Sequence, residues 1–187
     1  MSINVQRRQD SLLKSLLEFY KNEKNMKTLV NILEKEGDLS RRVLDFLCTN
    51  YAKKNDVFYY LTDKSGKRYP FHLHIQYRNQ LKAYSKMLFD PFRRHERITV
   101  PCSYVDTKKL QTTVAQLNFF RWAIEHKVLD WIKDSSNLKK VEEDMTNTTN
   151  QRKKEKEQEK NKKRKELSKN MNKSARTHNI KVTVSFS

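Results

Sequence analysis

The residues best suited to chemistry lie in one proline-centred segment, Phe89-Asp90-Pro91-Phe92-Arg93-Arg94-His95-Glu96-Arg97, which we call the elbow. Its three guanidinium groups can each bind a phosphate with two hydrogen bonds, and its two phenyl rings can stack on bases. An equally good interpretation is structural, with the phenylalanines as core anchors and the arginines paired with Asp90 or Glu96. The sequence leaves both readings open, and it predicts Arg93, Arg94 and Arg97 as phosphate contacts and Phe89 and Phe92 as stacking candidates.

Four possible metal ligands occur near the elbow, namely His72, His74, His95 and Cys102. The two histidines at 72 and 74 would share one face of a strand, so convergence is conceivable. However, zinc sites normally use closely spaced cysteine or histidine pairs, and neither pattern occurs here. We therefore predict no metal and no cofactor, and we leave these four residues open as ligands.

Acidic residues that could act as a general acid or base are scattered along the chain. His126 follows Glu125 directly on an expected helix, so the two side chains would not face each other. Only two glycines occur in the whole chain, which excludes a glycine-rich phosphate loop. The sequence thus predicts a protein that is not an enzyme.

Positive charge dominates the composition, with 40 Lys and Arg against 22 Asp and Glu and a net charge of +18. The excess is +11 over residues 1–133 and +7 over residues 134–187, so it is not confined to a tail. Such a surface attracts polyanions, and phosphate backbones bind it through the release of condensed counterions. Charge alone does not choose between DNA, RNA and an acidic protein.

The first half of the chain predicts three helices and a β-hairpin. Helices are expected at 10–20 and 24–36, and a third follows a cap at Asp38 or Ser40. Segments 57–61 and 69–74 then alternate as strands around a turn. This order occurs in winged-helix units, which gives a transcription-related factor as one alternative. The outer face of the third helix supplies four further candidate phosphate contacts: Arg41, Arg42, Lys53 and Lys54.

The second half predicts a helix at 75–88, the elbow, a strand at 97–100, a loop to Thr113 and one long amphipathic helix to about residue 133. Thr113 and Gln116 have the spacing of a helix capping box. Arg121, between two aromatic residues of the long helix, is a further candidate phosphate contact. The expected buried stripe of that helix follows a spacing of three and four: Val114, Leu117, Phe120, Ile124, Val128 and Trp131.

The composition changes after residue 133. We expect a basic α+β, mostly helical domain at 1–133, with a second boundary considered near residue 74, a charged linker at 134–178 and a strand at 179–187. The linker has too little apolar material for a core, so it should be disordered or a solvated single helix. Two basic clusters in it have the layout of a bipartite nuclear import signal and are candidate phosphate contacts: Arg152, Lys153, Lys154, Lys162, Lys163, Arg164 and Lys165.

Two further features bear on the protein's environment. Cys48 and Cys102 are far apart in apolar surroundings, which predicts two buried, reduced thiols. No apolar run approaches the length of a membrane span, so we expect no membrane insertion.

Three stretches of the chain carry a resemblance to a known group of proteins. They are the elbow, the helix sequence Gln116-Leu117-Asn118-Phe119-Phe120-Arg121-Trp122-Ala123-Ile124, and the tail from Arg164 to Val182. Over residues 75–187 the sequence resembles uncharacterised basic proteins of nucleocytoplasmic large DNA viruses. The resemblance implies a viral protein made in an infected cell, in the host nucleus or a cytoplasmic virus factory, with packaging in the virion as an alternative. It supplies no catalytic residues.

These observations favour a non-enzymatic protein that binds nucleic acid through phosphates, without strong sequence specificity. The alternative from another class is a structural scaffold or minor virion component. In that case the C-terminal strand would pair with a neighbouring protein or with a second copy of this chain.

Overall fold

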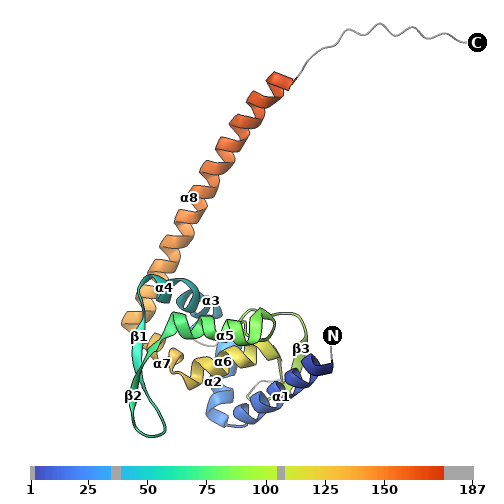
Figure 1. The fold of residues 1–187 in the computed structure, drawn as a ribbon, viewed down its shortest axis with the longest axis vertical. Helices are drawn as coiled ribbons and strands as arrows, with labels where there is room; N and C mark the ends of the chain where they lie inside the picture. The colour runs from blue at the N-terminus through green and yellow to red at the C-terminus, as the bar shows by residue number, and fades with distance from the viewer. Residues whose placement is uncertain (1–2, 35–38, 105–107, 175–187) are drawn as a thin grey trace, which may run out of the picture. The chain divides into compact units, whose positions relative to one another are not determined.

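The computed structural model describes residues 3–34, 39–104 and 108–174, and side chains within residues 9–159 of these ranges. It divides into one unit at Met1–Met145 and a second at Thr146–Ser187. The predicted class is confirmed: the fold is α+β and mostly helical, with two small antiparallel hairpins (Figure 1). In chain order the elements are α1 (Ile3–Tyr20), α2 (Glu23–Leu33), α3 (Arg41–Phe46), a π-helical turn η1 (Leu47–Tyr51), α4 (Ala52–Lys54), β1 (Phe58–Thr62), β2 (Arg68–His72), α5 (Leu73–Leu88), β3 (Arg97–Pro101), β4 (Lys109–Thr113), α6 (Val114–Glu125), α7 (Val128–Lys133) and α8 (Ser135–Ser174).

Helix α6 is the centre of the first unit. It packs against α1, α2, α5, α7 and β4. Eight of its residues are buried, including the polar Gln116 and Asn118. Because these buried residues lie on several faces of α6, the predicted amphipathic stripe describes only part of its buried surface. Of that stripe, Leu117, Phe120 and Val128 are buried, and Val114, Ile124 and Trp131 are partly buried.

The N-terminal helices belong to the same core as the rest of the unit. Ser40 caps α3 by accepting a hydrogen bond from the amide of Val43, as one of the two predicted caps. The buried hydroxyl of Tyr20 donates to the carbonyl of Leu117 at 2.9 Å, which ties α1 to α6. Residue 74 therefore lies inside a continuous unit, although α1, α2 and the continuous helical stretch 41–54 do precede a hairpin in the expected order.

The two hairpins are separate two-stranded sheets. In the first, β1 pairs with β2, and Gly66 takes the left-handed conformation that its turn requires. In the second, β3 pairs with β4 from Arg97 opposite Thr113 to Pro101 opposite Lys109. The predicted loop up to Thr113 is thus wrong at Lys109–Thr113, because β3 needs a partner strand and these residues supply it.

The long predicted helix at 114–133 is also two helices. Lys127 has a φ of 56°, which ends α6 and starts α7 at a new angle. The hydroxyl of Tyr59 donates to the carbonyl of His126 at 2.8 Å, so the break is held by a contact from β1. The Thr113 cap is confirmed, since its hydroxyl accepts from the amide of Gln116.

After α7 the chain forms α8, which covers most of the residues predicted as a charged linker. Its first turns belong to the first unit, because Val141 is fully buried and Leu138 and Met145 pack on the core. The first unit therefore runs to Met145, whereas the sequence placed a boundary after residue 133. The expected strand at 179–187 lies outside the described residues. None of the helices that the structure describes is long and apolar enough to cross a membrane.

Candidate functional site: an arginine hollow beside the elbow

Two buried amides of α6 hold the elbow. Asn118 donates from Nδ2 to the carbonyl of Leu88 at 2.9 Å, and Gln116 donates from Nε2 to the carbonyl of Pro91 at 3.2 Å. The carboxylate of Asp90 then accepts from the amide of Phe92 at 2.7 Å, which closes a tight turn. The chain direction at Arg93 and Arg94 is therefore fixed from the core outwards.

Four arginines from two separate parts of the chain meet around one hollow of about 300 Å³. Arg41 comes from the start of α3, whereas Arg93, Arg94 and Arg97 come from the elbow, whose last residue is also the first of β3. We call this feature the arginine hollow. Its other lining residues come from the end of α2, from β4 and from the start of α6: Leu33, Glu34, Gln111, Thr112, Thr113 and Gln116.

The charges of the arginine hollow are poorly balanced. Glu34 is the one carboxylate among the lining residues, against four guanidinium groups. Arg93 donates from Nη2 to Glu96 at 3.3 Å, and its Nε is shielded from solvent without a hydrogen-bond partner in the described part of the chain. Within the same described ranges, the guanidinium groups of Arg41, Arg94 and Arg97 form no hydrogen bond or ion pair. Cations gathered this way repel one another unless an anion lies between them.

The hydroxyl and amide groups of the lining could assist an anion. A hydroxyl or amide N–H can donate to a phosphate oxygen, and arginine offers two parallel N–H groups. Thr112 and Gln116 are already bonded to each other, at 3.0 Å between hydroxyl and amide oxygen. Because these two side chains are bonded to each other, the arginines are the main groups of the lining that can bind an anion.

One stacking candidate of the elbow is corrected by the structure. Phe89 is fully buried, with its ring 5.3 Å from that of Phe119 and 5.5 Å from that of Trp122, measured between centroids. It is a core anchor, so the prediction that it stacks on bases is wrong. Phe92, which precedes Arg93 in the sequence, is 38% exposed and does not line the hollow. The structural interpretation thus applies to Phe89, and Phe92 stays a stacking candidate.

The other predicted cations are not among the residues that line the arginine hollow. Arg42, Lys53 and Lys54 are exposed, and Lys54 forms an ion pair with Asp144. The three basic side chains at 152–154 are exposed on α8, whereas 162–165 lie on the same helix with side chains outside the described set.

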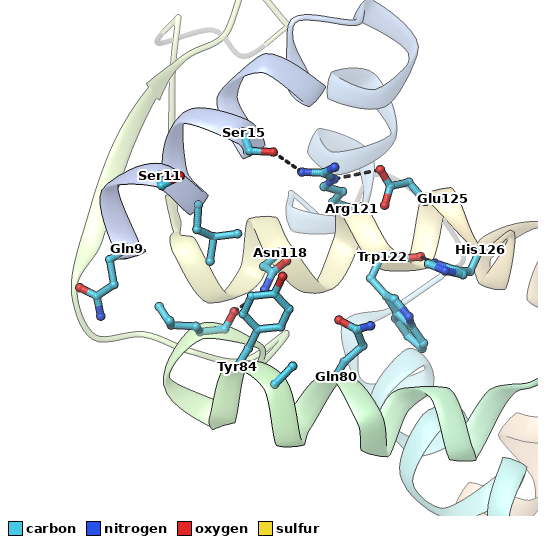
Figure 2. Close-up of a pocket in the computed structure, with 13 residues that line it drawn as sticks. Gln9, Ser11, Ser15, Gln80, Tyr84, Asn118, Arg121, Trp122, Glu125 and His126 are labelled. Atoms are coloured by element: carbon cyan, nitrogen blue, oxygen red, sulfur yellow. Dashed lines mark hydrogen bonds and ion pairs between the residues drawn. The ribbon is translucent and has the colours of Figure 1, made fainter. Parts of the chain in front are cut away.

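Arg121 lines a different and larger pocket, of about 730 Å³, between α1, α5 and α6. Figure 2 shows its guanidinium between Ser15 and Glu125, to which it donates at 2.7 Å and 2.9 Å. It also lies over the ring of Phe19. Because Arg121 and Glu125 neutralise each other, this pocket has no charge excess that would draw a phosphate chain.

The histidines and cysteines do not converge. A ring nitrogen of His74 lies 3.0 Å from the carbonyl of Cys48, His72 stacks on Phe58, and His95 is exposed at the elbow. The described residues contain no group of three or more side chains that could hold a metal. Both cysteines are buried and free, as predicted, and burial raises the pKa of the Cys48 thiol.

Sequence reasoning missed the polar lining of the arginine hollow. Gln111, Thr112 and Thr113 lie on the strand that was predicted as a loop, and Gln116 was seen only as half of a capping box. The available signal was the alternation of Leu110 and Thr112 with exposed neighbours, opposite a strand that needed a partner.

Comparison with known proteins places the chain in a family. Residues 4–187 match the family described as "Family of unknown function (DUF7197)", and the chain belongs to that family. It is also similar to "Uncharacterized protein L507" of Acanthamoeba polyphaga mimivirus, a large DNA virus, with 40% identity over 129 residues. The alignment covers 67% of this chain and 49% of the relative, so the chain spans about half the length of the curated relative it matches. No solved structure matches.

The resemblance to uncharacterised proteins of large DNA viruses is thus confirmed, and the family match extends over nearly the whole chain.

Proposed function

We propose that this protein binds nucleic acid through its phosphate backbone and catalyses no reaction. The arginine hollow is the primary phosphate contact. The exposed cations at 152–154 are a second contact on the same polypeptide, so once the hollow has bound they meet the nucleic acid at a high effective concentration and add affinity. Phosphate contacts position a protein on nucleic acid without reading bases, so strong sequence specificity is not expected. The viral relative is consistent with action in the host nucleus or a virus factory of an infected cell.

The observation that carries this proposal is the convergence of Arg41 with Arg93, Arg94 and Arg97. Arginines with a purely structural role would be buried and paired. Arg94 and Arg97 are instead exposed, and of the four arginines only Arg93 has an ion pair with another described residue. Holding four like charges around one hollow is unfavourable unless a bound anion offsets the repulsion. A phosphate chain supplies such an anion, and guanidinium groups match its geometry.

The proposal is tested with a triple variant, Arg41→Ala, Arg94→Ala and Arg97→Ala. Each phosphate contact contributes about 0.9 to the slope of log K against log salt, so loss of three contacts lowers the slope by about 2.7. Between about 50 and 200 mM salt, the variant's affinity should therefore fall roughly 40-fold less than that of the wild type. The measurement is a mobility-shift series with duplex DNA, single strands and RNA.

The matched control removes the same charge from elsewhere on the first unit: Lys14→Ala, Arg78→Ala and Lys82→Ala. These three side chains are exposed and do not line the hollow. We expect the control to keep most of the wild-type slope. Equal losses in both triple variants would reject the hollow as the site, and wild-type protein that binds neither heparin nor any oligonucleotide at low salt would refute the function.

A further inference from the structure

The outer face of the hairpin β1–β2 carries aromatic side chains that the core does not use. Alternate residues of a strand point to opposite faces. On the inner face Leu61 and Phe71 are buried, whereas on the outer face Phe58 is 52% and Tyr60 is 56% exposed. The pairing register places His72 opposite Phe58 on this outer face. We call Phe58, Tyr60 and His72 the aromatic face.

The rings of the aromatic face are arranged as a platform. The ring of His72 stacks on that of Phe58, with centroids 5.5 Å apart and an angle of 29° between the planes. Tyr60 meets Phe58 edge to face at 6.3 Å. The guanidinium of Arg68 lies over the ring of Tyr60, 5.1 Å from its centroid. Flat rings that are both exposed and held by neighbours lose little freedom when a flat ligand stacks on them.

Positive charge adjoins this platform at the turn. Lys64, Lys67 and Arg68 are exposed there. The acidic Asp63 is occupied within the turn, since its carboxylate accepts from the hydroxyl of Ser65 and from the amides of Ser65 and Lys67. These hydrogen bonds hold the pKa of Asp63 below its ordinary value. The end of the hairpin therefore complements an anionic chain, with aromatic rings immediately beside the cations.

We propose that the aromatic face is a second binding site, which stacks the unpaired bases of single-stranded nucleic acid while Lys64, Lys67 and Arg68 contact its phosphates. Stacking uses the π-face of a base, which a duplex hides, so this site prefers single strands. The proposal rests on the proposed nucleic-acid function but names a different site. In Figure 1, β1–β2 and β3 lie on opposite sides of the first unit, and no residue of the aromatic face lines the arginine hollow.

The test replaces both rings by a smaller apolar side chain, in full-length protein with Phe58→Leu and Tyr60→Leu. Affinity for oligothymidylate of about 30 nucleotides should fall roughly tenfold or more, the loss expected when one or two bases no longer stack. Affinity for a duplex of the same length should change less than twofold. The control is Tyr104→Leu, which alters an aromatic side chain of similar exposure outside the hairpin, at 39%.

A second variant keeps the test independent of folding defects. Tyr60→Trp retains an aromatic ring, so it should keep single-strand affinity within about twofold and should add indole fluorescence that a stacked base quenches. Unchanged oligothymidylate affinity in the Leu variant, or equal losses on single strand and duplex, would overturn the proposal. So would sedimentation showing that the wild type self-associates through this face, with the Leu variant monomeric and its affinity intact.

The two proposals fail in different ways. If the triple arginine variant weakens binding to all nucleic acids while the Leu variant does not, the arginine hollow stands and the aromatic face does not. If wild-type protein binds no nucleic acid at all, the proposed function itself is refuted.

Discussion

Replacing Gln116 by Met should loosen the elbow without removing any charge. The buried Gln116 side chain makes two hydrogen bonds, donating to the carbonyl of Pro91 at 3.2 Å and accepting from the hydroxyl of Thr112 at 3.0 Å. Methionine has nearly the same length but can make neither bond, so one carbonyl and one hydroxyl lose their buried partner. At about 1–2 kcal/mol for each group, the free energy of unfolding should fall by about 2–4 kcal/mol.

The assay is chemical denaturation followed by tryptophan fluorescence, since Trp122 lies on the same helix and is buried. The control is Gln111→Met, the same chemical change at an exposed position of β4 that also lines the hollow. It should alter the free energy of unfolding by less than about 0.5 kcal/mol. A Gln116→Met protein as stable as the control would refute the claim that α6 holds the elbow.

A double-mutant cycle with Thr112→Val isolates one of the two bonds. Because the two side chains bond each other, the double variant should lose less stability than the sum of the single variants, by about 0.5–2 kcal/mol. The same Gln116→Met protein should bind nucleic acid more weakly than the Gln111→Met control, although both keep every arginine. Strict additivity would show that the bond contributes nothing.

Two further predictions concern stability. Burial raises the pKa of the Asp45 carboxyl above 3.8, the nearby Asp90 raises it further, and Lys86 opposes the shift. Ionising Asp45 therefore costs more in the folded protein than in the unfolded chain. Its contribution to folding becomes less favourable as pH rises from about 3.8 through the raised pKa. Asp45→Asn should therefore raise the melting temperature at pH 7, and this gain should vanish at about pH 3; a gain independent of pH would contradict the argument. Lys127 is held at a φ of 56°, where glycine has no Cβ penalty, so Lys127→Gly should stabilise the protein by up to about 1 kcal/mol in denaturant melts. A loss of stability there would show that the Lys127 side chain outweighs the strain.

Local signals predicted most of the fold, and the errors have tertiary causes. Caps at Ser40 and Thr113 and the turn at Gly66 are short-range features, and all three appear in the structure. No glycine or proline near Lys127 indicates that the helix breaks between α6 and α7. The hydrogen bond that holds this break comes from Tyr59, in a strand distant in the sequence. Periodicity on a single helix cannot reveal such a contact.

The candidate site was predictable only in its local part. Arg93, Arg94 and Arg97 are close in sequence, and their spacing predicted a cluster. The approach of Arg41 could not be read from spacing, because it depends on how α3 packs beside β4 and the elbow. Phe89 is a second case in which sequence position alone was misleading. Its place beside the arginines made it a binding candidate, but its ring packs against Phe119 and Trp122 in the core.

Each two-stranded sheet has two open edges, and one edge strand of each sheet contains a proline. Pro70 lies in β2 and Pro101 in β3, and neither has an N–H to offer an incoming strand. The other edge of each sheet is formed by β1 or β4. An incoming strand would therefore find a row of N–H donors uninterrupted by proline only along β1 and β4.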